Sequence, residues 1–264
     1  MELGIRGRVA LVCGASRGLG LACAQALVEE GVDVMLVARS AEGLEQAAAG
    51  LRAASRSPGC GAVAWTAADI ATARGRRDAL AAQAHYDIVV TNAGGPPPGD
   101  FRQWEREDWL AALDANMLAP IELMRATVDA MAQRGYGRVL NITSGAVKAP
   151  IQNLGLSNGA RSGLTGFVAG LARSGLAAQG VTINNLLPGP FETDRLIGTM
   201  KKVAQASGQS WEDLRSERMA RVPAARFGRP EELGALCAFL CSVQAAYITG
   251  QNILIDGGSF GGTL

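Results

Sequence analysis

The chain has 264 residues, of which 48% are apolar, and its formal net charge at pH 7 is +1. This length and apolar content predict one large folded domain and exclude a disordered chain. The balanced charge excludes a general attraction to nucleic acid or to an anionic membrane, and no run of 18 apolar residues predicts a membrane span. Residues 1–8 are charged and lack the apolar run of a signal peptide, so we expect a cytoplasmic protein.

Five cysteines are scattered along the sequence without a CxxC pair. An odd number at irregular spacing is not typical of a disulfide framework or of a zinc site, and we expect no metal. We therefore predict that the cysteines are small core residues, namely Cys13, Cys23, Cys60, Cys237 and Cys241.

Short apolar runs rich in Val, Ile and Leu alternate with alanine-rich stretches of helical spacing. Such runs are typical of strands covered on both faces of a parallel sheet. The alternation predicts a single α/β domain, residues 1–264, with a doubly wound parallel Rossmann sheet of seven strands. The predicted strands are Val9–Cys13, Val32–Val37, Gly61–Trp65, Asp87–Thr91, Gly137–Thr143, Val181–Leu187 and Asn252–Ile255, and the predicted helices include Leu19–Glu30 and Glu42–Ala54.

The connection after the sixth predicted strand differs from the others. Residues 189–222 are longer, more polar and less regular than the other connections. Ligands of doubly wound folds bind beyond the carboxyl ends of the strands, where this connection begins. We therefore predict a small lobe or lid over the substrate at about residues 189–222.

A glycine-rich loop joins the first predicted strand to the first predicted helix and reads Gly14-Ala-Ser-Arg-Gly18-Leu-Gly20. Glycines let the backbone turn tightly and approach a pyrophosphate, and the helix N-terminus supplies free N–H groups and a partial positive charge. At the first strand-to-helix junction of an alternating chain, this pattern predicts a dinucleotide site.

The end of the second predicted strand favours NADP(H) over NAD(H). Sites for NAD(H) usually place Asp or Glu here to accept from the ribose 2′-hydroxyl, whereas this chain has Arg39 and Ser40. Arg39, with Arg17 from the loop, would form charge-assisted bonds to a 2′-phosphate, each contributing about 1.5–3 kcal/mol. The alternative is that both arginines are solvated surface side chains.

At this point the sequence resembles the short-chain dehydrogenase/reductase family, and within it the 3-oxoacyl-carrier-protein reductase branch. The resemblance covers nearly the whole chain and rests on motifs in the family's order and spacing. Besides the glycine-rich loop, these are Asp69-Ile70, Thr91-Asn92-Ala93-Gly94, Asp114-Ala-Asn116-Met117, Asn141-Ile-Thr-Ser144, Pro188-Gly189 with Thr193, Arg226–Glu232 and Gly250–Gly258.

The resemblance implies roles for these residues. Asn116 and Ser144 match the family's catalytic asparagine and serine, and the loop with Pro188, Gly189 and Thr193 matches the one that holds the nicotinamide carboxamide. The residues that the resemblance and the loop chemistry assign to NADP(H) are Gly14, Ser16, Arg17, Gly18, Leu19, Gly20, Arg39, Ser40, Asp69, Ile70, Asn92, Ala93, Gly94, Arg161, Pro188, Gly189 and Thr193.

The sequence departs from the family at two catalytic positions. Relatives carry a tyrosine thirteen residues after the serine and a lysine four residues further on, where this chain has Ser157 and Arg161. The serine hydroxyl is far less acidic than a phenol, and an arginine does not deprotonate at working pH. Arg161 would still bond to the ribose hydroxyls and stabilise nearby negative charge.

Three other side chains are expected near the pocket, and one of them, Lys148, is a candidate to replace the missing proton donor. Lys148 follows Ser144 by four residues, on the loop that lines the pocket in relatives, and a solvated loop lysine is the alternative. Glu192 and Asp194 follow the sixth predicted strand, and for both the alternative is capping of the next helix.

Glycines recur in the predicted helix that carries Ser157, at a cost to helix stability of up to ~1 kcal/mol each relative to alanine. In relatives this helix packs against its symmetry mate, so the resemblance implies a homo-oligomer, a tetramer, with packing inside one chain as the alternative. These glycines are Gly155, Gly159, Gly163, Gly166 and Gly170.

The predicted function is NADP(H)-dependent reduction of a carbonyl or related C=X bond of a small molecule, or the reverse oxidation. This prediction depends on the cofactor-binding motifs of the family that the sequence carries. The missing acid pair leaves two alternatives open. One is a non-redox enzyme on the same scaffold, an isomerase, dehydratase or cyclase, and the other is a catalytically silent regulator that binds the cofactor.

Overall fold

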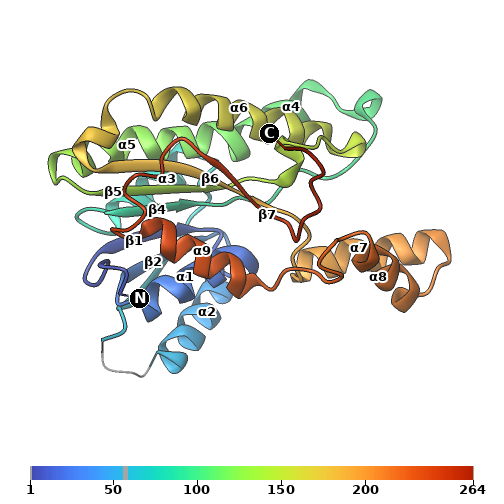
Figure 1. The fold of residues 1–264 in the computed structure, drawn as a ribbon, viewed down its shortest axis with the longest axis horizontal. Coiled ribbons are helices and arrows are strands. Elements are labelled where there is room, and N and C mark those ends of the chain that lie inside the picture. Colours follow the sequence, from blue (N-terminus) through green and yellow to red (C-terminus); the bar gives the residue numbers. More distant parts are fainter. Residues whose placement is uncertain (1, 56–58, 264) are drawn as a thin grey trace.

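A parallel sheet of seven strands runs through the whole molecule, with the strand order β3-β2-β1-β4-β5-β6-β7 (Figure 1). The computed structural model describes residues 2–55 and 59–263. The direction in which successive strands are added reverses between β1 and β4. This reversal creates the crevice in which doubly wound folds bind their ligands. The strands are β1 Val9–Cys13, β2 Asp33–Ala38, β3 Val63–Ala67, β4 Ile88–Thr91, β5 Gly137–Ile142, β6 Val181–Pro188 and β7 Asn252–Ile255.

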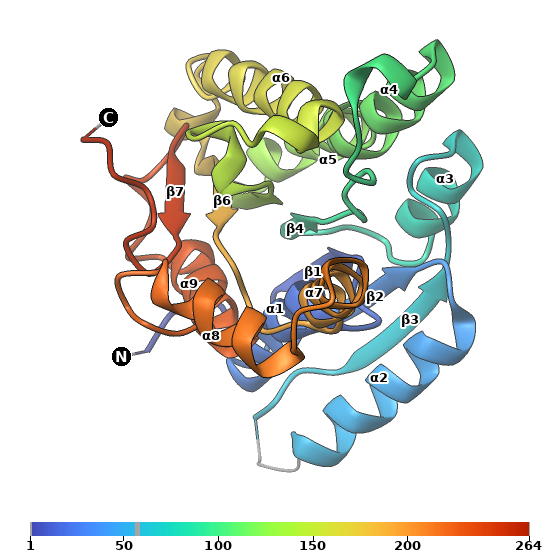
Figure 2. The ribbon, with the colours of Figure 1, turned by 90° about the vertical axis from the view of Figure 1, so that its right-hand side faces the viewer.

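Helices cover both faces of the sheet (Figures 1 and 2). One core joins the sheet to α1, α2 and α9 through buried side chains such as Leu27, Leu44 and Leu233. A second core joins the opposite face to α3, α5 and α6 through Met124, Leu164 and Val168 among others. The helices are α1 Gly18–Glu29, α2 Ala41–Ala54, α3 Ala73–Ala81, α4 Arg106–Leu113, α5 Ala119–Gln133, α6 Gly155–Leu171, α7 Asp194–Ser207, α8 Trp211–Ala220 and α9 Pro230–Cys241.

The central strands are buried throughout, which explains their continuous apolar runs. Four of the five cysteines lie buried in these two cores, and Cys60 is half-buried. Within residues 2–55 and 59–263, no group of His, Cys, Asp and Glu is arranged to hold a metal ion. No helix of the same residues is long and apolar enough to cross a membrane.

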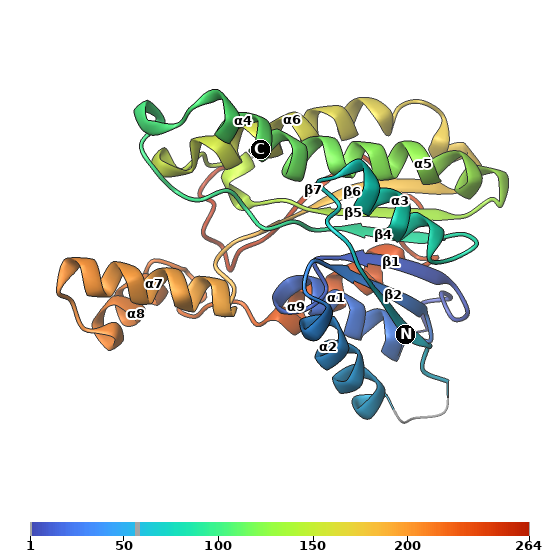
Figure 3. The ribbon, with the colours of Figure 1, turned by 180° about the vertical axis from the view of Figure 1, so that it is seen from behind.

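The segment after β6 forms a helical lobe at the carboxyl edge of the sheet. It contains α7 and α8, which project from the body of the molecule (Figures 1 and 3). The two helices share a small core with Phe227, built from Met200, Ala204 and Leu214.

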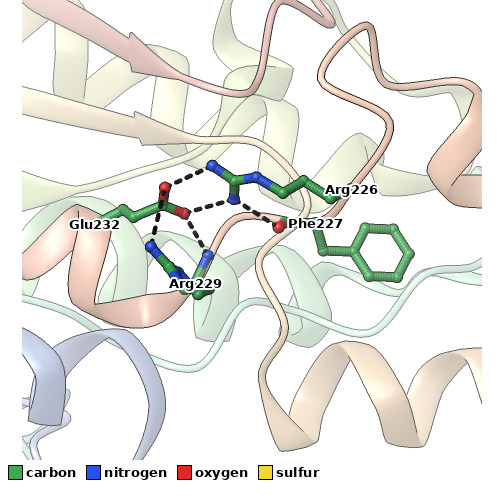
Figure 4. Close-up of polar contacts among 4 residues, drawn as sticks. All are labelled: Arg226, Phe227, Arg229 and Glu232. Carbon is green, nitrogen blue, oxygen red and sulfur yellow. Dashed lines mark hydrogen bonds and ion pairs between the residues drawn. The ribbon is translucent and has the colours of Figure 1, made fainter.

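The two chain segments that connect this lobe to the body run side by side. Phe191 and Gly228 pair there as an isolated parallel bridge. Beyond it, Arg226 donates two hydrogen bonds to the Glu232 carboxylate, at 2.6 and 2.8 Å, and the Arg229 backbone N–H donates a third at 2.7 Å (Figure 4). This network fixes the start of α9, because Glu232 caps the helix from its first turn.

Candidate functional site

The glycine-rich loop has the geometry of an anion site. Gly14 and Gly18 both have a φ of +61°, which favours glycine. Gly20 lies so close to the carbonyl of Gly14 that a Cβ would collide with it. Arg17 precedes α1 without capping it, so the first amide groups of the helix have no side-chain acceptor. Free N–H groups around a tight loop fit the pyrophosphate of a dinucleotide.

The end of β2 carries exposed positive charge, and residues 38–40 include no acid. Arg39 and Arg17 are both exposed, and no ion pair among the described residues includes either of them. Ser40 accepts from the Gly43 backbone N–H at 3.1 Å and caps α2, and its own proton stays free to donate. The arrangement fits a ribose 2′-phosphate.

The ends of β3 and β4 complete this side of the crevice. The Asp69 carboxylate accepts from the Ala71 N–H at 3.0 Å, which shapes the turn that carries the buried Ile70. After β4, Asn92 packs against Gly14 so closely that a Cβ on that glycine would collide with it. Ala93 and Gly94 follow Asn92 directly in the chain.

Ser144 lies just beyond the end of β5. Its Oγ accepts from the backbone N–H of Ala146 at 3.1 Å, which orients the hydroxyl. A hydroxyl that accepts one bond still has its proton to donate. The Ser144 hydroxyl therefore has a free proton, which its predicted role toward a substrate oxygen requires.

Asn116 lies in a single π-helical turn, residues 114–118, between α4 and α5. Such turns are often found at functional sites. Its Nδ2 donates to the Ala112 carbonyl at 3.3 Å, whereas its Oδ1 is buried with no partner. A hollow of about 10 Å³ adjoins Asn116 and Arg161, close to the size that one water needs.

Ser157 and Arg161 share one face of α6, one turn apart, and each is only 7% exposed. Arg161 Nη1 donates to the backbone carbonyls of Ile142 at 2.8 Å and Thr143 at 2.6 Å, at the end of β5. Burial and the nearby charge of Arg195 lower the pKa of Arg161 to about 10, so the group is still positive at neutral pH.

The loop after β6 holds the other side of the crevice. Gly189 packs against Asp256 without room for a Cβ. Thr193 accepts from the Leu196 N–H at 3.3 Å and caps α7, and its methyl group lies over Gly18. The start of the lobe therefore meets the phosphate loop directly.

The three other side chains expected near the pocket have different surroundings. Glu192 forms an ion pair with Arg215 at 2.6 Å. Asp194 is the exposed first residue of α7. Lys148 places its Nζ 5.6 Å from the centre of the Phe260 ring, in the segment after β7. None of these contacts reaches Ser144 or Ser157.

Two functional features escaped the sequence analysis. Arg195 crosses the crevice, packs over Gly95 and donates to its carbonyl at 3.2 Å. The other is a ladder of polar side chains across four neighbouring strands, from β4 to β7, buried except for the half-buried Asn252. Its hydrogen bonds, at 2.7, 3.0 and 2.8 Å, join Thr91 to Asn141, Asn141 to Asn185 and Asn185 to Asn252.

The glycines of α6 divide into two groups. A Cβ on Gly155 would collide with Trp104 and one on Gly163 with Met117, and Gly159 faces Trp109, all within this chain. The two tryptophan rings meet edge to face at 5.9 Å. Gly166 and Gly170, further along the helix, have no neighbour within 4 Å among the described residues. Packing within one chain therefore accounts for the first three glycines only.

Comparison with known proteins places the chain in a family. A family model described as enoyl-(acyl carrier protein) reductase matches residues 14–259. The 3-oxoacyl-(acyl-carrier-protein) reductase of Vibrio harveyi is 33% identical over 98% of this chain and 99% of its own. The corresponding reductase of Escherichia coli is 32% identical over the same shares.

Solved structures agree with this assignment. L-sorbose reductase of Gluconobacter frateurii, complexed with NADPH and L-sorbose, superimposes with a TM-score of 0.92 at 29% identity, over 99% of this chain and 100% of the other. YwfH, an NADPH-dependent reductase involved in bacilysin biosynthesis, gives 0.89 at 27% identity over 97% and 99%. The chain therefore belongs to the short-chain dehydrogenase/reductase family of NAD(P)-dependent oxidoreductases.

Proposed function

We propose that the protein is an NADPH-dependent oxidoreductase that reduces a carbonyl or related C=X bond of a small molecule. The observation that carries the cofactor choice is the acid-free end of β2, where Arg39 and Arg17 are exposed and unpaired among the described residues. Two guanidinium groups favour a 2′-phosphate over a bare ribose hydroxyl.

The phosphate loop and the loop after β6 would hold the two halves of the cofactor. The glycine-rich loop and the uncapped N-terminus of α1 fit the pyrophosphate. The family resemblance assigns Pro188, Gly189 and Thr193 to the nicotinamide, and we propose that they hold it. When bound, NADPH supplies a hydride at the nicotinamide C4. Neighbouring structures described as NADPH complexes support this assignment, among them an actinorhodin polyketide ketoreductase.

The residues around Ser144 would act on the substrate oxygen. The Ser144 hydroxyl donates a hydrogen bond to it, and the Arg161 guanidinium stabilises the negative charge that develops there. Ser157 is a poor acid, because an alcohol holds its proton far more tightly than a phenol. The hollow beside Asn116 fits one water, and the unpartnered Asn116 Oδ1 would accept a hydrogen bond from it. We propose that this water passes the proton to the product.

We also propose that the protein works in the cytoplasm as a homo-oligomer, a tetramer. Gly166 and Gly170 leave one stretch of α6 smooth and open, and the exposed Phe167 lies between them. An exposed apolar stretch on a glycine-rich helix suits close packing against a second copy. Light scattering of the purified protein measures the mass, and a monomer at assay concentration would refute this part.

The activity is tested by incubating the protein and NADPH with a set of ketones and aldehydes and following the NADPH absorbance at 340 nm. Loss of NADPH absorbance that requires both protein and ketone is the expected result. Turnover of a substrate without any change at 340 nm would show a non-redox enzyme instead. Tight NADPH binding with no turnover on a broad panel would show a silent binding protein.

A further inference from the structure

Arg161 is a buried positive charge without an acidic partner. It is 7% exposed, and among residues 2–55 and 59–263 no carboxylate pairs with it. Its two hydrogen bonds go to neutral carbonyls and both use Nη1, which leaves Nε and Nη2 without an acceptor in the described residues. Charges buried in this way are normally paired, because removing an ion from water is costly.

A second guanidinium adds to the same charge. Arg195 donates only to the Gly95 carbonyl and forms no ion pair with the residues that the structure describes. It lies near enough to Arg161 to lower the pKa of that group. Two guanidinium groups that form no ion pair among the described residues favour an anionic occupant nearby.

The cofactor does not supply an anion for Arg161. Its pyrophosphate would lie at the N-terminus of α1, beside Gly18, which the start of α7 covers through Thr193. The nicotinamide ribose, which the family resemblance assigns to Arg161, is neutral. The missing negative charge therefore belongs to the substrate.

The position of Arg161 fixes where on the substrate that charge lies. Its Nη1 donates to the Thr143 carbonyl, and Ser144, which would bind the reacting oxygen, is the next residue. Neighbouring Cα atoms are about 3.8 Å apart, so the Arg161 guanidinium and Ser144 meet at the same end of β5, and we infer that the groups they bind are neighbours on one molecule. A carboxylate on the reacting carbon satisfies this spacing.

We propose that Arg161 binds a carboxylate attached to the carbon that is reduced, and that the substrate class is the 2-oxo acids. This inference rests on the proposed reductase function. The carbonyl carbon accepts a hydride from NADPH, the C=O π pair moves onto oxygen, and that oxygen takes a proton from water. The products are a 2-hydroxy acid and NADP⁺, so two electrons pass from cofactor to substrate.

This binding mode accounts for the change from lysine to arginine. A guanidinium offers two parallel N–H groups that match two oxygens, whereas an ammonium is a point charge. In a 2-oxo acid, one carboxylate oxygen and the carbonyl oxygen lie side by side. Arg161 would hold both of them and would stabilise the charge that develops on the second.

The test compares oxamate with oxamide by calorimetry, with and without NADP⁺. The two compounds have the same skeleton and neither is reduced, but only oxamate carries a carboxylate. We expect the native protein to bind oxamate at least about tenfold more tightly, since a charge-assisted bond contributes about 1.5–3 kcal/mol. Arg161→Met removes that preference. Arg161→Lys keeps it in weakened form, because lysine keeps the charge and loses the fork.

Equal binding of oxamate and oxamide by the native protein would overturn the proposal, and this comparison needs no variant to fold. Inorganic phosphate that competes as well as oxamate would overturn the choice of a carboxylate. NADPH titration of the same samples distinguishes a failure of the proposed substrate class from a failure of the proposed reductase function. If NADPH binds and oxamate shows no preference, only the substrate class fails. If NADPH does not bind but oxamate depends on Arg161, the reductase function fails.

Discussion

Replacing Ser157 by tyrosine and Arg161 by lysine together is expected to raise the reduction of a neutral ketone at least about tenfold. The two side chains lie one turn apart on the buried face of α6 that points to the end of β5. Tyrosine there would place a phenol beside Ser144. The substitution would supply the placed acid that the native chain lacks.

The size of the expected rate increase follows from the reach and the acidity of the tyrosine hydroxyl. A serine hydroxyl ends roughly 4 Å short of a tyrosine hydroxyl on the same backbone, and a phenol has a pKa of about 10. A correctly placed proton donor typically contributes about 10²–10⁴ in rate, equivalent to about 3–5 kcal/mol. We expect a rate increase at or below the lower end of this range, because Ser157 is only 7% exposed and the residues around it must move to make room for a tyrosine ring.

The assay measures kcat with 4-phenyl-2-butanone at saturating NADPH, by the absorbance at 340 nm. Ser157→Ala is the matched control, because it removes the hydroxyl without adding an acid, and it should leave the rate unchanged. The double variant should gain less rate on 2-oxo-4-phenylbutanoate than on the neutral ketone, because lysine keeps the charge but loses the two parallel N–H groups that would hold the carboxylate. If the folded double variant binds NADPH normally but reduces the neutral ketone no faster, the missing acid is not what limits the native enzyme.

Four further substitutions, one of them a control, test the cofactor site and the base of the lobe. Arg39→Asp should weaken NADPH binding at least about tenfold and NADH binding much less, by fluorescence titration; equal losses would refute the 2′-phosphate assignment. Gly20→Ala should abolish dinucleotide binding, because its Cβ would collide with the Gly14 carbonyl, whereas Gly50→Ala, in open space on α2, should raise the melting temperature. Hydrogen bonds from the Arg226 side chain and from the Arg229 backbone lower the pKa of Glu232 to about 2. The ionised carboxylate therefore stabilises the fold above about pH 4.5, and this stabilisation is lost as the pH falls through about 2. Glu232→Gln should therefore melt below the native protein at pH 7 and together with it near pH 2, and a constant difference would contradict this.

Most of the fold could be predicted from the sequence, because strands covered on both faces need continuous apolar runs. The predicted run Val9–Cys13 coincides with β1 and Asn252–Ile255 with β7, and the other strands agree within two residues. The lobe was harder to predict. Helix α7 does carry apolar residues at helical spacing, Leu196, Met200 and Ala204, but the sequence-based prediction treated the whole segment as irregular.

The site was predictable only as a set of residues. The motifs place Ser144, Asn116 and the glycine-rich loop at one edge of the sheet, and the structure brings them there. The polar ladder through Asn141 and Asn185 could not be predicted, because it depends on the register of four strands. The lack of an acidic partner for Arg161 could not be predicted either. It depends on which side chains surround Arg161 in the fold, and the sequence does not show this.

The most direct test of the central claim is a fluorescence titration of the native protein with NADPH and with NADH. The account predicts saturable NADPH binding, at least about tenfold tighter than NADH binding, because two unpaired arginines favour the 2′-phosphate. Equal affinity for both, or no binding of either, would contradict it.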